Sequence, residues 1–87
     1  MLAQKLIDKK LAACVQVSPI TSYYTWNNES CIDTEIRLVI KTRTQLYENV
    51  EHFIKKNHSY EVPQIVQTSI TDGSDDYFDW IDEITSD

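Results

Sequence analysis

The stretch "ITSYYTWNNESCIDTEIRLVIK", Ile20 to Lys41, consists of two runs of β-branched and aromatic residues separated by "NNES" at 27–30. Runs of this composition favour strands, and asparagine and serine favour the tight turn that joins neighbouring strands. The stretch therefore predicts a β-hairpin. The preceding "CVQVSP" at 14–19 extends the first strand, and its Ser18–Pro19 pair predicts a bend or a bulge, because proline has no amide hydrogen to donate.

Helical patterns and one further strand pattern surround the hairpin. Apolar residues at helical spacing predict a helix that begins near Leu2 and ends near Leu11 to Ala13, and a second helix within residues 42–58. The segment "YEVPQIVQTSI" at 60–70 predicts a third strand, and an amphipathic helix follows over 74–84. No linker or repeat interrupts this order, so residues 1–87 are expected to form one α+β domain.

The composition limits the possible partners and the location. Fourteen acidic residues against eight basic residues give a net charge of −6, which repels phosphate backbones and anionic lipid. We therefore expect no nucleic-acid binding and no membrane association. No run has the length and apolar character of a signal peptide or a membrane span, so we expect a cytoplasmic protein in which Cys14 and Cys31 are free thiols.

The two strands of the hairpin also predict self-association. Ile36 and Ile40 share one face of the second strand, which we expect the helices to cover. In the first strand, Tyr24 and Trp26 lie on one face while Tyr23 lies on the other. Because a small one-layer sheet covers only one face with its own helices, the second aromatic face is expected to be solvated or buried against further copies of the chain.

Four stretches resemble the CutA family, the small proteins linked to tolerance of divalent cations. They are "KLAACVQV" at 10–17, "SYYTW" at 22–26, "EIRLVIKT" at 35–42 and "HSYEVPQI" at 58–65. The last two are the most specific, and the resemblance covers nearly the whole chain in order. It implies a ferredoxin-like subunit, βαββαβ with a C-terminal helix, that assembles into a tight homotrimer with the architecture of the PII-type signalling proteins.

The sequence departs from the family pattern in two places. Asn28 stands in the turn where the family commonly has glycine, and asparagine also reaches left-handed backbone angles, so we expect the turn to be kept. The family also has a β-strand before the first helix, and the given chain lacks it. An empty central position in the sheet would leave buried backbone groups unpaired, so we expect either a longer natural protein or another segment in that position.

The metal resistance reported for the family implies a divalent ion, copper or zinc, as a possible ligand. His58 begins the "HSYEVPQI" stretch, and imidazole binds both ions well, so His58 is the first candidate ligand and Cys14 the second. Each has an alternative role that stays open here. His58 is also suited to a hydrogen bond at the start of a strand, and Cys14 to a place in the core as a small hydrophobic residue.

Further residues are candidates for a ligand site or a subunit boundary. They come from the family-like stretches, and they are Tyr24, Trp26, Glu35, Lys41, Tyr60 and Glu61. In an extended chain Tyr60 lies on the same side as His58, whereas Glu61 points the other way. His58 and Glu61 therefore need not meet within one subunit. Across a trimer interface they could meet partners from a neighbouring chain, such as Lys41, Tyr24 or Trp26.

Two other kinds of site are disfavoured. Asp72, Ser74, Asp76 and Glu83 have the spacing of a calcium-binding loop, but Tyr77 stands where that loop needs glycine. No catalytic triad order or glycine-rich phosphate loop is found, so we expect no enzyme. The rival interpretations are a PII-like sensor that binds a small anionic metabolite in clefts between subunits, and a scaffold without a ligand.

Overall fold

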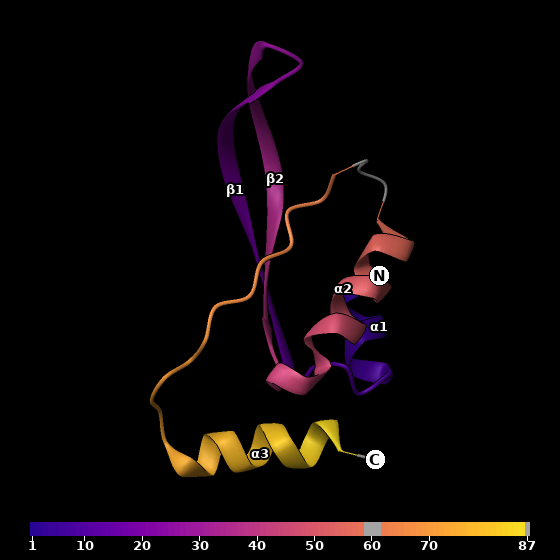
Figure 1. The fold of residues 1–87 in the computed structure, drawn as a ribbon, viewed down its shortest axis with the longest axis vertical. Helices are drawn as coiled ribbons and strands as arrows, with labels where there is room; N and C mark the ends of the chain where they lie inside the picture. The colour runs from indigo at the N-terminus through magenta and orange to yellow at the C-terminus, as the bar shows by residue number, and fades with distance from the viewer. Residues whose placement is uncertain (59–61, 87) are drawn as a thin grey trace.

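The computed structural model describes residues 1–58 and 62–86, and it has the expected α+β character (Figure 1). Its sheet contains two antiparallel strands in the order β1–β2. The elements in chain order are α1 (Leu2–Asp8), β1 (Cys14–Trp26), β2 (Glu29–Lys41), the 3-10 helix η1 (Thr44–Leu46), α2 (Tyr47–Asn57) and α3 (Asp75–Thr85). None of the helices in the described ranges is long and apolar enough to cross a membrane.

The hairpin is longer and more regular than the sequence predicted. Its register runs without interruption from Cys14 opposite Lys41 to Trp26 opposite Glu29, so the predicted bulge at Ser18–Pro19 is wrong. Paired positions alternate between hydrogen-bonded and non-hydrogen-bonded along an antiparallel ladder, and the pair beside a two-residue turn is hydrogen-bonded. Pro19 lies seven residues from Trp26, at a non-hydrogen-bonded position, so the strand loses no ladder bond there.

The turn between the strands is built on two asparagines. Asn27 and Asn28 have φ angles of 52° and 63°, the left-handed pair that a two-residue hairpin turn requires. The right-handed twist of strands favours this mirror-image turn, and asparagine tolerates its angles better than most residues. The prediction that Asn28 keeps the turn is confirmed.

The first helix ends earlier than predicted because of a C-terminal capping motif. Lys10 has a φ of 58°, the amide of Leu11 donates to the carbonyl of Leu6 at 3.0 Å, and the amide of Lys10 donates to the carbonyl of Ile7 at 3.0 Å. This pair of bonds is the Schellman arrangement, which turns the chain out of the helix and satisfies its last carbonyls. Helix α1 therefore ends at Asp8, and the chain enters β1 at Cys14.

The core lies where α1 and α2 meet the base of the hairpin. Its buried residues include Leu6, Val50 and Ile54, with exposed fractions of 0%, 4% and 7%. Val15 and Ile40, which are opposite each other in the register, pack against this cluster. In Figure 1 the two helices lie beside the lower part of the hairpin, while its tip projects beyond them.

The predicted third strand is wrong for the described part of its range. Residues 62–70 have no strand structure, and Figure 1 draws them as a long segment between α2 and α3. A strand needs a neighbour for its backbone groups, and within the described chain β2 pairs with β1 alone. A groove of about 1500 Å³ is lined by residues of this segment, of β2 and of α2, including Leu38, Ile54 and Ile65.

The last helix begins at a side-chain cap, Ser74, but packs little of its apolar side. The Ser74 hydroxyl accepts a hydrogen bond from the amide of Tyr77 at 3.3 Å. Of the apolar side chains on this helix, Ile81 is buried, whereas Trp80 and Ile84 remain exposed. Helix α3 therefore packs against the rest of the domain through only a small part of its apolar face.

Candidate functional site

Three of the predicted site residues lie along one groove. Glu35 and Lys41 of β2 and His58, the first residue after α2, all line the 1500 Å³ groove. Tyr24, Trp26 and Cys14 are not among its lining residues. Tyr60 and Glu61 lie outside the described residues, so the parts of the prediction that concern them stay predictions.

The hairpin separates the other candidates by its length. Tyr24 is opposite Cys31 near the tip, whereas Cys14 is opposite Lys41 at the base. These two cross-strand pairs are ten residues apart along β1, which is about 33 Å in a strand that rises about 3.3 Å per residue. Within one chain, the tip and the base therefore belong to different sites.

The base of the hairpin places Lys41 beside the last helix. Its carbonyl accepts a hydrogen bond from the amide of Ala13 at 2.9 Å, and its Nζ lies 6.0 Å from the centre of the Tyr77 ring. An ammonium group over an aromatic ring is attracted by the negative face of the ring. Cys14, half-buried and with a free thiol, follows the buried pair Ala12 and Ala13.

A divalent ion would need ligands from more than one place. Within residues 1–58 and 62–86, no group of three or more histidine, cysteine, aspartate or glutamate side chains is placed to hold a metal ion. His58 is half-buried and extended, with φ −103° and ψ 145°. Because copper and zinc sites use several ligands, a site at His58 requires further donors from another copy of the chain or from outside the described residues.

One structural interaction escaped the sequence patterns. Arg43 donates from Nε to the Thr85 hydroxyl at 2.8 Å and from Nη2 to the Thr85 carbonyl at 3.0 Å, and that hydroxyl donates to the Ile81 carbonyl at 2.7 Å. A cation is favoured at a helix C-terminus, and α3 has no basic residue in its own last turn. The lack of a basic residue in the last turn of α3 was the sequence signal that a cation from elsewhere in the chain could interact with the C-terminus of this helix.

Near the tip of the hairpin, Tyr24 donates a hydrogen bond to the Asp33 carboxylate. The carboxylate accepts from the neutral phenol and repels the phenolate, so this hydrogen bond is the main cause that raises the pKa of Tyr24 from 10.0 to about 12. The phenol is protonated in both the folded and the unfolded chain below pH 10. The stabilising effect of the bond is therefore complete below pH 10 and is lost as the pH rises toward 12.

We predict that Asp33→Ala returns the pKa of Tyr24 toward 10, because alanine removes both the acceptor of the hydrogen bond and the charge that repels the phenolate. The measurement is an NMR titration of ring-labelled tyrosine between pH 8 and pH 13. Glu35→Gln is the matched control, since Glu35 is the weakest of the groups that raise this pKa. An unchanged Tyr24 titration in the Asp33 variant would contradict the assignment.

Comparison with known proteins gives a consistent family. The model described as "CutA1 divalent ion tolerance protein" matches residues 1–84. The divalent-cation tolerance protein CutA of Thermus thermophilus is 39% identical over 85 residues, which cover 97% of this chain and 82% of that protein. The chloroplastic protein CutA of Arabidopsis thaliana is 41% identical over 97% of this chain, which spans about half of that relative, 47%.

Solved structures agree with this match. The periplasmic divalent cation tolerance protein CutA from Archaeoglobus fulgidus has a TM-score of 0.96 and 38% identity, with 98% of this chain and 83% of that chain covered. The PII-like protein CutA from Nostoc sp., in apo form, has a TM-score of 0.93 and 30% identity, with 98% and 84% covered. Because relatives are described as chloroplastic and as periplasmic, the cytoplasmic location of this chain stays a prediction.

Proposed function

Because the chain belongs to the CutA1 divalent ion tolerance family, we propose that it acts in the tolerance of divalent metal ions, as a ferredoxin-like homotrimer that binds copper or zinc. The match over residues 1–84 carries this proposal and confirms the resemblance found in the sequence. The proposed role is one of binding rather than catalysis, in keeping with the family description.

The exposed hairpin supports assembly. Alternate residues of paired strands share a face, so Tyr23, Ile32 and Ile36 continue the face on which Val15 and Ile40 meet the core. Beyond the helices this face is uncovered, and the three side chains are 76%, 64% and 62% exposed. We expected the helices to cover Ile36, and that expectation is wrong. The Thr21–Thr34 pair lies on the same face between these side chains. An exposed, largely apolar surface of this kind is typical of a subunit interface.

The electrostatics support a cationic ligand. The net charge of −6 attracts divalent ions. The lining of the groove includes the imidazole of His58 and the carboxylate of Glu35, together with the cationic side chains of Arg37, Lys41 and Arg43. Imidazole and carboxylate are common ligands of zinc. Association of copies could bring such groups from two chains to one ion, which would supply the donors that one chain does not bring together.

We predict that His58→Ala weakens copper or zinc binding by about tenfold or more while the assembly stays intact. Isothermal titration calorimetry with each ion measures the affinity, and light scattering on the same samples measures the mass. His52→Ala is the matched control, because His52 is an exposed histidine of α2, the helix that ends just before His58, and it lies outside the groove.

Three outcomes would contradict parts of this proposal. Equal metal affinity of the His58 variant and the parent would exclude His58 as a ligand. Dissociation of that variant into monomers would show that His58 is structural. If neither copper nor zinc gave heat with the parent, metal binding itself would be contradicted.

A PII-like sensor is the second candidate function. It is favoured by the similarity to a structure described as a PII-like protein. In that case nucleotides rather than metal ions should give heat, and the ligand should lie in clefts between subunits. A scaffold without a ligand should give heat with neither.

A further inference from the structure

A second recess lies between α1 and α2, outside the groove that contains His58. It is an open depression of the surface with a volume of about 580 Å³. Its walls include Lys5 and Lys9 from the first helix and its end, and His52, Phe53 and Lys56 from the second helix.

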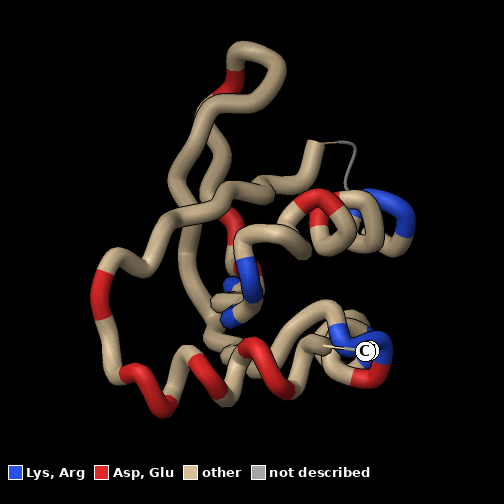
Figure 2. Tube along the Cα trace, turned by 60° about the horizontal axis from the view of Figure 1, so that its bottom comes forward, with Lys and Arg blue, Asp and Glu red and all other residues tan. Residues whose placement is uncertain are grey.

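The recess concentrates positive charge on an acidic protein. Three of the eight lysine and arginine residues of the chain line it. Figure 2 shows this contrast, with basic residues at α1 and at the end of α2 and acidic residues along α3. The single carboxylate in the lining, Asp8, accepts a hydrogen bond from Gln4 at 2.9 Å, and Lys9 Nζ lies 5.7 Å from the centre of the Phe53 ring.

Helix-end electrostatics explain only part of this arrangement. Lysines near a helix C-terminus are favourable, and Lys5 and Lys56 are each in the last turn of their helix. The preference for lysine at a helix end explains each lysine separately. It does not explain why lysines from two helices line the same recess, because their like charges repel one another. An anion between the ammonium groups would remove the repulsion.

We propose that this recess binds a small ligand that carries two or more phosphate groups. Lysine binds phosphate as a compact point charge with three donors, and several ammonium groups around one recess suit a ligand with several negative charges. The net charge of −6 opposes binding of a long nucleic acid, whereas a small ligand contacts only the local basic surface. The site lies within one chain and does not depend on the proposed metal binding.

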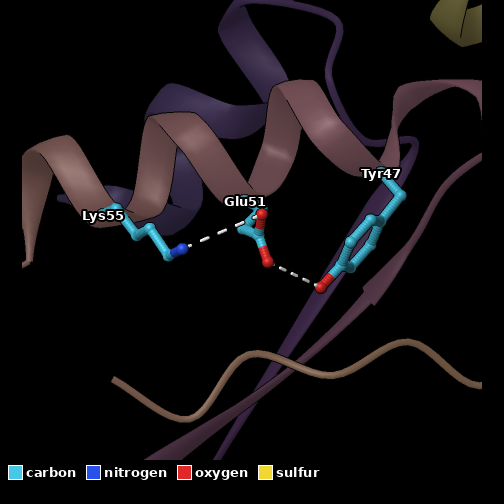
Figure 3. Close-up of polar contacts among 3 residues, drawn as sticks. All are labelled: Tyr47, Glu51 and Lys55. Carbon is cyan, nitrogen blue, oxygen red and sulfur yellow. Dashed lines mark hydrogen bonds and ion pairs between the residues drawn. The ribbon is translucent and has the colours of Figure 1, made fainter. Parts of the chain in front are cut away.

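The test is calorimetry of the metal-free, full chain with inorganic pyrophosphate and tripolyphosphate. Lys56→Gln should weaken the binding of both by about tenfold, the expected loss for one charge-assisted contact. Lys55→Gln is the matched control for an equal loss of charge in the next residue. Lys55 Nζ lies 3.9 Å from Glu51, its side chain is 60% exposed, and Figure 3 shows it on the side of α2 that carries Tyr47.

The Lys55 variant should keep the affinity of the parent within about twofold. Lys9→Gln should also weaken the binding of both phosphates, because Lys9 lines the recess from the end of α1, whereas Lys56 lines it from α2. Equal losses in the Lys55 and Lys56 variants would show a general effect of charge and overturn the site. Absence of heat with both phosphates at millimolar concentration would overturn it as well, and neither result would affect the proposal for His58.

Discussion

Ile36→Asp is expected to convert the proposed trimer into monomers. Ile36 is opposite Pro19, on the apolar face of the hairpin that extends beyond the helices. If this face is covered by neighbouring copies, aspartate would place a charge in an apolar interface, and an unpaired buried charge costs several kcal/mol. That penalty would apply in each subunit.

Light scattering coupled to size exclusion checks this result at several concentrations. The parent should have three times the chain mass of 10.2 kDa and should keep it on dilution to nanomolar, as obligate interfaces do. Asn28→Asp is the control, since it also adds a carboxylate to the hairpin but lies in the turn. A monomeric parent at micromolar concentration would contradict the assembly, and a trimeric Ile36 variant would contradict this interface.

Leu6→Ala is expected to lower the free energy of unfolding by about 2–5 kcal/mol. Among the described residues Leu6 is the largest fully buried side chain, with an exposed fraction of 0%, and it belongs to the cluster that joins α1 to α2 and the hairpin. Its truncation removes apolar contacts and leaves a cavity that the surrounding helices fill only in part. The loss is a large fraction of the 5–15 kcal/mol typical of a small domain.

Urea unfolding followed by circular dichroism measures this loss, at one protomer concentration because assembly also contributes to the stability. Ile70→Ala is the matched control. Ile70 is 54% exposed and lies outside the core cluster, so its truncation should cost less than 1 kcal/mol. Equal losses in the two variants would mean that the cluster around Leu6 does not hold the domain together.

The sequence by itself determined the features that depend on residues close together along the chain. Apolar spacing predicted the helices that contain Leu6 and Val50, and composition predicted the hairpin. Asn28 gave the turn and Ser74 gave a helix cap, because each acts through its own backbone or that of a residue a few positions away. The local stretches also carried the family resemblance, which the match over residues 1–84 confirms.

The tertiary structure alone decided the features that depend on distant partners. The pattern in 62–70 favours a strand, but a strand forms only where a neighbouring edge accepts its hydrogen bonds, and the described chain gives this segment none. Ile36 has the pattern of a core residue, but it is 62% exposed, whereas Ile40 on the same face packs against the core cluster. The contact of Arg43 with Thr85 and the recess shared by Lys5 and Lys56 likewise join residues more than 40 positions apart. Local patterns describe which face a residue takes, whereas packing between distant elements decides what that face meets.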